Sequence, residues 1–181
     1  MALSELTEKV TEIIHSSNKS VALSMVTYTM ANVKYGGVTK ADAYKIVKSS
    51  ESTQGSLWSA LSGVMQQFPQ ELKPYEDDLI GFDGGMMLIS TSINSRKEAA
   101  AELANYLDTG SLKSLDQYEK KLRESMGFMA QGVNKVKKVG DELGVQVEIT
   151  TTLDEAVEEV KTVLSDLEKY PFIAGMPSTE I

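Results

Sequence analysis

The sequence predicts a mainly α-helical fold: a helical bundle with a long helical hairpin and a minor β element, with an α+β fold as the alternative. From Leu115 to Leu143, apolar residues recur at steps of three and four, which places them on one stripe of a helix. Residues 20–33 carry no charge, so a helix there must be buried on most sides. Only residues 86–93 and 145–149 have a β-like pattern, and two short strands do not make a stable sheet alone.

Residues 1–69 are predicted to form an N-terminal helical bundle. Ser4 can cap a first helix, because its hydroxyl can accept a hydrogen bond from an unpaired amide of the first turn. The polar run at 15–20 is expected to interrupt or end this helix. The uncharged segment 20–33 follows as a central helix; a strand is the competing interpretation, because valine, threonine and tyrosine favour sheets.

Two shorter helices complete this N-terminal half. Thr39 can cap a helix over residues 40–48. The small polar residues at 49–56 predict a loop. Residues 57–68 then follow as another helix, and Pro69 ends it because proline has no amide hydrogen.

Residues 70–94 are predicted to be an acidic connection followed by a short strand at 86–93. The acids, the proline and the glycine pair of the connection suit an exposed segment between two halves of the structure.

Residues 95–170 are predicted to hold the helical hairpin, a short strand at 145–149 and a final helix. Ser95 begins a capping box for the first hairpin helix, and Ser114 begins one for the long helix, because a glutamate or glutamine follows each serine three residues later.

Glycines and a third capping box set the remaining boundaries. Gly110 and Gly144 follow the two hairpin helices at the position where a helix usually ends. Thr152 with Glu155 forms the third capping box, which opens the final helix. Residues 171–181 are predicted to be a flexible tail.

The predicted long helix contains three glycines. Gly127, Gly132 and Gly140 each cost about 1 kcal/mol relative to alanine in a helix interior. One interpretation is a break or kink between Gly127 and Gly132. The other is a close helix–helix contact at these positions, which can join two copies of the chain.

The amino-acid composition limits the kinds of catalytic and metal site that the chain can form. The chain has 181 residues, a net charge of −8, no cysteine and a single histidine, His15. Thiolate chemistry, disulfides and cysteine-ligated metals are therefore excluded, and His15 is assigned a structural or surface role. We predict no catalytic residue, no metal site and no cofactor.

The same composition bears on partners and location. No segment is basic enough to be an obvious nucleic-acid footprint, so nucleic acid is the less favoured partner. No run is apolar enough to cross a membrane, and the N-terminus lacks the pattern of a signal peptide. A cytoplasmic location is expected.

The leading functional hypothesis is a non-enzymatic protein–protein interaction or assembly protein that forms a homo-oligomer. Its candidate interface is the pair of apolar seams on the long helix and on the final helix, although these seams can instead be used inside the monomer. The candidate residues are Met126, Met129, Val133, Val136, Leu143, Val157, Val160 and Leu164.

Two other functions compete with this hypothesis. Residues 38–68 can form a helix-turn-helix reader of DNA, in a regulator that dimerises through the long helix, but the second of its helices has no lysine or arginine to contact phosphates. The acids between Glu76 and Asp83 can serve a carboxylate-based enzyme or bind a cation or small ligand. They lack the spacing of a calcium loop, and a solvated acidic loop is the simpler interpretation.

Overall fold

The computed structural model describes residues 3–33, 38–67, 76–149 and 153–166. These residues form five helices: α1 (Leu3–Val33), α2 (Lys40–Met65), α3 (Glu76–Thr109), α4 (Leu112–Glu142) and α5 (Asp154–Asp166). The described residues contain no strand. The predicted helical bundle is therefore confirmed, while the minor β element is not present in the described part of the chain.

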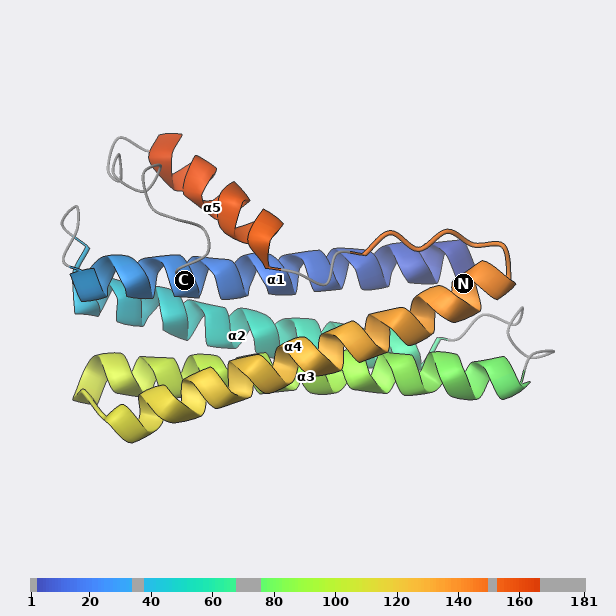
Figure 1. Ribbon diagram of the computed structural model, residues 1–181, viewed down its shortest axis with the longest axis horizontal. Coiled ribbons are helices and arrows are strands. Elements are labelled where there is room, and N and C mark those ends of the chain that lie inside the picture. Colours follow the sequence, from blue (N-terminus) through green and yellow to red (C-terminus); the bar gives the residue numbers. More distant parts are fainter. Residues whose placement is uncertain (1–2, 34–37, 68–75, 150–152, 167–181) are drawn as a thin grey trace.

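The first four helices form the bundle. Helix α2 packs against both α1 and α3, and α4 packs along α3 as the second arm of a hairpin. Figure 1 shows α4 leaving the hairpin turn and crossing the bundle obliquely, so that its end lies near the beginning of α1. The chain then runs back along α1 as an extended segment at 145–149, and α5 packs on the middle of α1.

Two buried apolar clusters fill the bundle. One surrounds Leu103, Val26 and Val157, near the α3–α4 turn. The other surrounds Ile14, Ile89 and Val133, toward the opposite end. Both clusters contain residues from the first and from the second half of the chain. The division into separate halves at residues 1–69 and 95–170 stays a prediction.

The strand predicted at 86–93 is wrong, because this segment lies inside α3. Its buried residues, Met86, Ile89 and Ile93, are spaced by three and four, which is the period of a helix face and not of a strand. Packing of this face against α4 outweighs the β propensity of isoleucine and threonine. The strand predicted at 145–149 is also not formed: the segment is extended but pairs with no strand of the described residues.

Two predicted interruptions are also absent. Residues 15–20 lie inside α1, and residues 49–56 lie inside α2. Polar side chains on the inner faces of the two segments pair with each other: the Ser17 Oγ donates to Gln54 Oε1 over 2.7 Å, and Ser20 and Ser50 share a hydrogen bond. These partners are far apart in sequence. A prediction based on neighbouring residues alone therefore assigns both segments to loops or helix ends.

The helix ends were predicted with mixed success. Thr39 caps α2 as predicted, and the structure adds a full capping box with Asp42 that was not predicted. Gly110 and Gly144 both take positive φ, at 72° and 74°, which supports their predicted role as helix stops. Ser111, and not Ser114, caps α4, so that predicted boundary is three residues late.

Other predicted boundaries differ from the structure or lie outside it. Ser95 lies in the interior of α3 and begins no helix, and Ser4 lies within the first turn of α1. Pro69, Thr152 and the tail at 171–181 lie outside the described residues. Helix α4 continues through Gly127 and Gly132, so the predicted break is wrong. No helix of the described segments combines the length and the apolar character that a membrane crossing needs.

Candidate functional site

The predicted interface residues of α4 lie in the interior of the single chain. Met129, Val133 and Val136 are completely buried in the cluster that α4 shares with α1 and α3. Met126 and Leu143 are partly buried at the edges of the two clusters. The structure thus places these side chains inside the monomer, which is one of the two arrangements that the sequence allowed.

The predicted interface residues of α5 are placed in the same way. Val157 and Val160 are buried in the cluster that includes α1. The side chain of Leu164 lies outside the described residues.

A backbone contact joins α3 to α4 at two glycines. A Cβ added at Gly132 would lie 2.6 Å from the carbonyl oxygen of Gly85, and one added at Gly85 would lie 2.9 Å from the carbonyl oxygen of Gly132. No other residue type fits at this crossing without moving a helix. The close contact predicted at Gly132 exists, and it is formed within one chain. At Gly127, by contrast, nothing lies within 4 Å of an added Cβ.

A polar network occupies the centre of the bundle. Arg96 of α3 donates from Nη1 to the Ser17 Oγ and to the Asn18 Oδ1, both over 2.8 Å. The Gln54 amide of α2 donates to the Ser17 carbonyl over 3.0 Å. The Ser92 hydroxyl of α3 donates to the Ser125 carbonyl of α4 over 2.7 Å. Side chains from α1, α2 and α3 thus meet at Ser17.

Arg96 is a buried cation whose partners are all neutral. Its side chain is 1 % exposed, and no carboxylate of the described residues pairs with it. Burial lowers the pKa of the guanidinium to about 10, so it stays charged at neutral pH. Its Nε has no hydrogen-bond partner in the described structure. This arrangement costs free energy, because a buried charge normally pairs with an opposite charge.

Sequence reasoning missed Arg96, although a signal for it exists. The buried face of α3 recurs at steps of three and four, and Arg96 occupies one of these positions in place of an apolar residue. A lone charged residue within an apolar register indicates either a buried polar network or a buried site. The full register is Met86, Ile89, Ile93, Arg96, Ala100 and Leu103.

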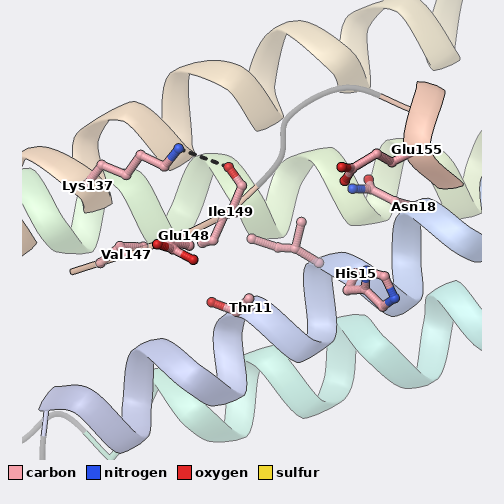
Figure 2. A pocket seen from close by; sticks show the side chains of 9 residues that line it. Thr11, His15, Asn18, Lys137, Val147, Glu148, Ile149 and Glu155 are labelled. Atoms are coloured by element: carbon pink, nitrogen blue, oxygen red, sulfur yellow. Dashed lines mark hydrogen bonds between the residues drawn. The ribbon is translucent and has the colours of Figure 1, made fainter.

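A polar hollow of about 540 Å³ lies between α1, the second half of α4, the extended segment and the start of α5. Figure 2 shows Thr11, His15 and Asn18 of α1 on one side of it, with Glu148 and Ile149 across from them. The Lys137 ammonium donates to the Ile149 carbonyl over 2.9 Å, which fixes the extended segment on α4.

The histidine of this hollow is exposed. His15 Nε2 lies 3.7 Å from a carboxylate oxygen of Glu159, and both side chains are about half exposed. The Thr11 hydroxyl donates to the Thr7 carbonyl of its own helix, so it does not form a nucleophile–base pair with His15. The hollow can hold a polar ligand, but it does not contain a catalytic arrangement of a known type.

A second hollow, of about 420 Å³, lies between α1 and the first half of α4. Tyr28 and Tyr118 form part of its wall and contact each other edge to face, with ring centroids 6.3 Å apart. Burial raises the pKa of the Tyr118 phenol well above its ordinary value. The remaining lining is mostly apolar and consists of Met25, Thr29, Glu119, Leu122, Arg123, Met126 and Leu153.

The outer face of α2 is unusual for an acidic protein. From Ser52 to Gln67 the chain has no charged residue, although 24% of the whole sequence is charged. Several side chains of this stretch are exposed, and they include Trp58, the only tryptophan, at 39%. The other exposed residues are Ser52, Thr53, Ser56, Ser59, Ala60, Gly63, Gln66 and Gln67.

The structure does not support the two alternative sites predicted from the sequence, the helix-turn-helix and the acidic segment at 76–83. Residues 40–65 form one uninterrupted helix, so the turn of the predicted helix-turn-helix is absent. Glu76 to Asp83 lie at the start of α3, where the side chains are outside the described residues. The described residues contain no group of three side chains that could hold a metal ion.

Comparison with protein-family models, with curated proteins and with solved structures gave no match to this chain.

Proposed function

We propose that this protein is a non-enzymatic interaction or assembly protein that forms a homo-oligomer through the outer face of α2. The described residues of the apolar seams of α4 and α5 pack in the core, so these seams are not the interface in this proposal. The observation that carries the proposal is the uncharged exposed stretch from Ser52 to Gln67 with Trp58 on it.

The charge distribution supports a second copy as the partner. Each copy has a net charge of −8, so two copies repel each other over most of their surfaces. The part of this face from Ser52 onward is a stretch where two copies can meet without juxtaposing like charges. Small side chains such as Ser59, Ala60 and Gly63 allow two helices to approach closely, and tryptophan is enriched at the centres of interfaces. A symmetric dimer uses one such face twice.

We also propose a cytoplasmic location. The support for it is the absence of cysteine from the sequence, since secreted domains commonly depend on disulfides.

Sedimentation equilibrium at micromolar concentration tests the assembly. We expect the wild-type protein to dimerise, and Ser59→Glu to shift it to monomer, because the new carboxylates of two copies would face each other. Ser16→Glu is the matched control, since Ser16 is an exposed serine of α1 and the substitution adds the same charge. Trp58 supplies a second readout: its emission should shift to the blue as wild-type protein is concentrated, and not in Ser59→Glu.

Two results would contradict the proposal. A wild-type protein that is strictly monomeric throughout the concentration range has no assembly of this kind. Equal behaviour of Ser59→Glu and Ser16→Glu in a protein that does dimerise would place the interface away from α2.

A further inference from the structure

The guanidinium of Arg96 has one satisfied edge and one unsatisfied edge. Nη1 donates to Ser17 and Asn18. The opposite edge is formed by Nε and Nη2, whose N–H bonds point the same way in the planar group. Nε has no partner among the described residues, and Nη2 donates only to the Sδ of Met126, a weak acceptor, over 3.7 Å. The edge that arginine uses for two parallel hydrogen bonds thus faces a thioether.

This edge has the geometry and the charge to bind a carboxylate. Two parallel N–H bonds of a guanidinium match the two oxygens of a carboxylate, and such pairs are among the strongest hydrogen-bonded contacts in proteins. The cation is buried and has only neutral partners among the described residues, so one negative charge placed there would neutralise it.

Met126 separates this edge from the apolar hollow between α1 and α4. The same side chain contacts Nη2 of Arg96 and lines the hollow of about 420 Å³. Methionine is unbranched and adapts its rotamer at low cost. Met126 is therefore the side chain that would have to turn for a ligand in the hollow to reach Nη2 of Arg96.

The lining of the hollow defines the rest of the ligand. Tyr28, Tyr118 and Leu122 offer aromatic and aliphatic surface. The hollow is within the range of ~300–1,000 Å³ typical of small-molecule sites, at its lower end. The wall carries one acid and one base, Glu119 and Arg123, whose charges offset each other, so the single buried charge of Arg96 matches a monoanion.

We propose that Arg96 and this hollow form a binding site for a small amphiphilic monocarboxylate. Its carboxylate pairs with Nε and Nη2 of Arg96, and its apolar body lies against Tyr28, Tyr118 and Leu122. Met126 turns aside to admit it. The site is separate from the outer face of α2, so its existence does not depend on the proposed assembly.

Calorimetric titration of the full chain with octanoate tests this site. Octanol is the uncharged probe with the same body, and acetate is the charged probe without it. We expect octanoate to bind at least about tenfold more tightly than either control, because a charge-assisted bidentate contact and the apolar burial act together. Equal affinity of octanoate and octanol, or no binding of octanoate at millimolar concentration, would overturn the proposal.

A matched pair of variants locates the carboxylate. Arg96→Met should weaken octanoate binding about tenfold or more and leave octanol unchanged. Arg123→Met removes an exposed arginine of the same hollow and should change octanoate affinity by less than about threefold. The reverse result, in which only Arg123→Met loses affinity, would place the carboxylate at the rim and refute the role of Arg96.

A second pair tests the gate and stands even if Arg96→Met does not fold. Met126→Phe retains the arginine but adds a rigid ring where the methionine must turn aside, so octanoate binding should fall. Met126→Leu keeps the volume nearly unchanged and should retain binding. Undiminished binding to Met126→Phe would show that octanoate does not reach Arg96 past this residue, and the proposal would fail.

Discussion

Gly85 and Gly132 hold α3 and α4 in direct backbone contact. A Cβ added at Gly132 would lie 2.6 Å from the Gly85 carbonyl oxygen and 3.0 Å from the Ile89 amide nitrogen. These two are backbone atoms, which cannot turn away as a side chain can; the third near atom is the side-chain Cγ1 of Ile89, at 2.8 Å. The crossing therefore sets the approach of the two helices and, with it, the packing of Ile89 and Val133 into the apolar cluster.

Alanine at Gly132 should destabilise the protein although alanine is the better helix former. We expect Gly132→Ala to lower the free energy of unfolding by about 1–3 kcal/mol, because the added methyl group forces the two helices apart. Gly127→Ala is the matched control on the same helix. Since Gly127 is exposed with nothing within 4 Å of an added Cβ, this change should raise the free energy by about 1 kcal/mol. Urea unfolding of both variants measures the difference, and a stabilised Gly132→Ala would contradict the contact.

A charge at Val133 should unfold the chain and not merely dissociate an oligomer. Val133 is completely buried in the cluster of α1, α3 and α4. An aspartate there leaves an unpaired carboxylate in an apolar core, which costs roughly 3–5 kcal/mol. Its neighbour Asn134 is exposed, so Asn134→Asp adds the same charge with little effect. Circular dichroism during thermal melting distinguishes the two. A Val133→Asp variant that melts like the wild type but sediments as a smaller species would restore α4 as an interface.

The features that the sequence predicted correctly depend on neighbouring residues. The cap at Thr39 accepts from the amide of Asp42, only three residues on, and Gly110 and Gly144 supply a backbone conformation that other residues rarely adopt. The apolar stripe of α4 follows from its period alone. Such signals can be read from one chain without knowing what packs against it.

The features that the sequence predicted wrongly depend on distant partners. Residues 15–20 and 49–56 resemble loops because they are small and polar, yet Ser17 and Gln54 satisfy each other across α1 and α2. A hydrogen bond between side chains of two helices leaves no pattern among neighbouring residues, since its partners here lie 37 residues apart. The candidate binding site was missed for the same reason. The burial of Arg96 and its contacts to Ser17 and Met126 come from α1 and α4, which are distant from it in sequence.

The phenol of Tyr118 should make the protein sensitive to alkali. Burial, with smaller contributions from Tyr28 and Glu119, raises the pKa of Tyr118 in the folded state above its unfolded value near 10. The folded state therefore keeps a proton that the unfolded state releases. The stability that Tyr118 contributes is full below pH 10 and is lost as the pH rises from there toward the folded pKa. Tyr118→Phe removes the ionisable group, so its free energy of unfolding should fall less steeply above pH 10.

Tyr44→Phe provides the control for this comparison. Tyr44 is partly buried on α2 and loses its hydroxyl in the same way. Chemical denaturation on both sides of pH 10 compares the two variants with the wild type. Parallel alkaline slopes for Tyr118→Phe and the wild type would show that the Tyr118 phenol ionises as readily in the folded state as in the unfolded state.

The buried charge of Arg96 should lower the stability of the ligand-free protein. The guanidinium is desolvated and no carboxylate of the described residues pairs with it. Replacing even a buried ion pair by apolar side chains of similar volume is often neutral or stabilising, by up to about 1–4 kcal/mol, and a buried cation with neutral partners lacks the attraction that offsets its desolvation. We therefore expect Arg96→Met to unfold at an equal or higher urea concentration than the wild type. Arg123→Met, at an exposed position, should stay within about 0.5 kcal/mol. A loss of more than about 2 kcal/mol in Arg96→Met would mean that the contacts to Ser17 and Asn18 outweigh the desolvation of the cation. In that case Arg96 would be an organiser of the core, and the energetic reason for a bound anion would be gone.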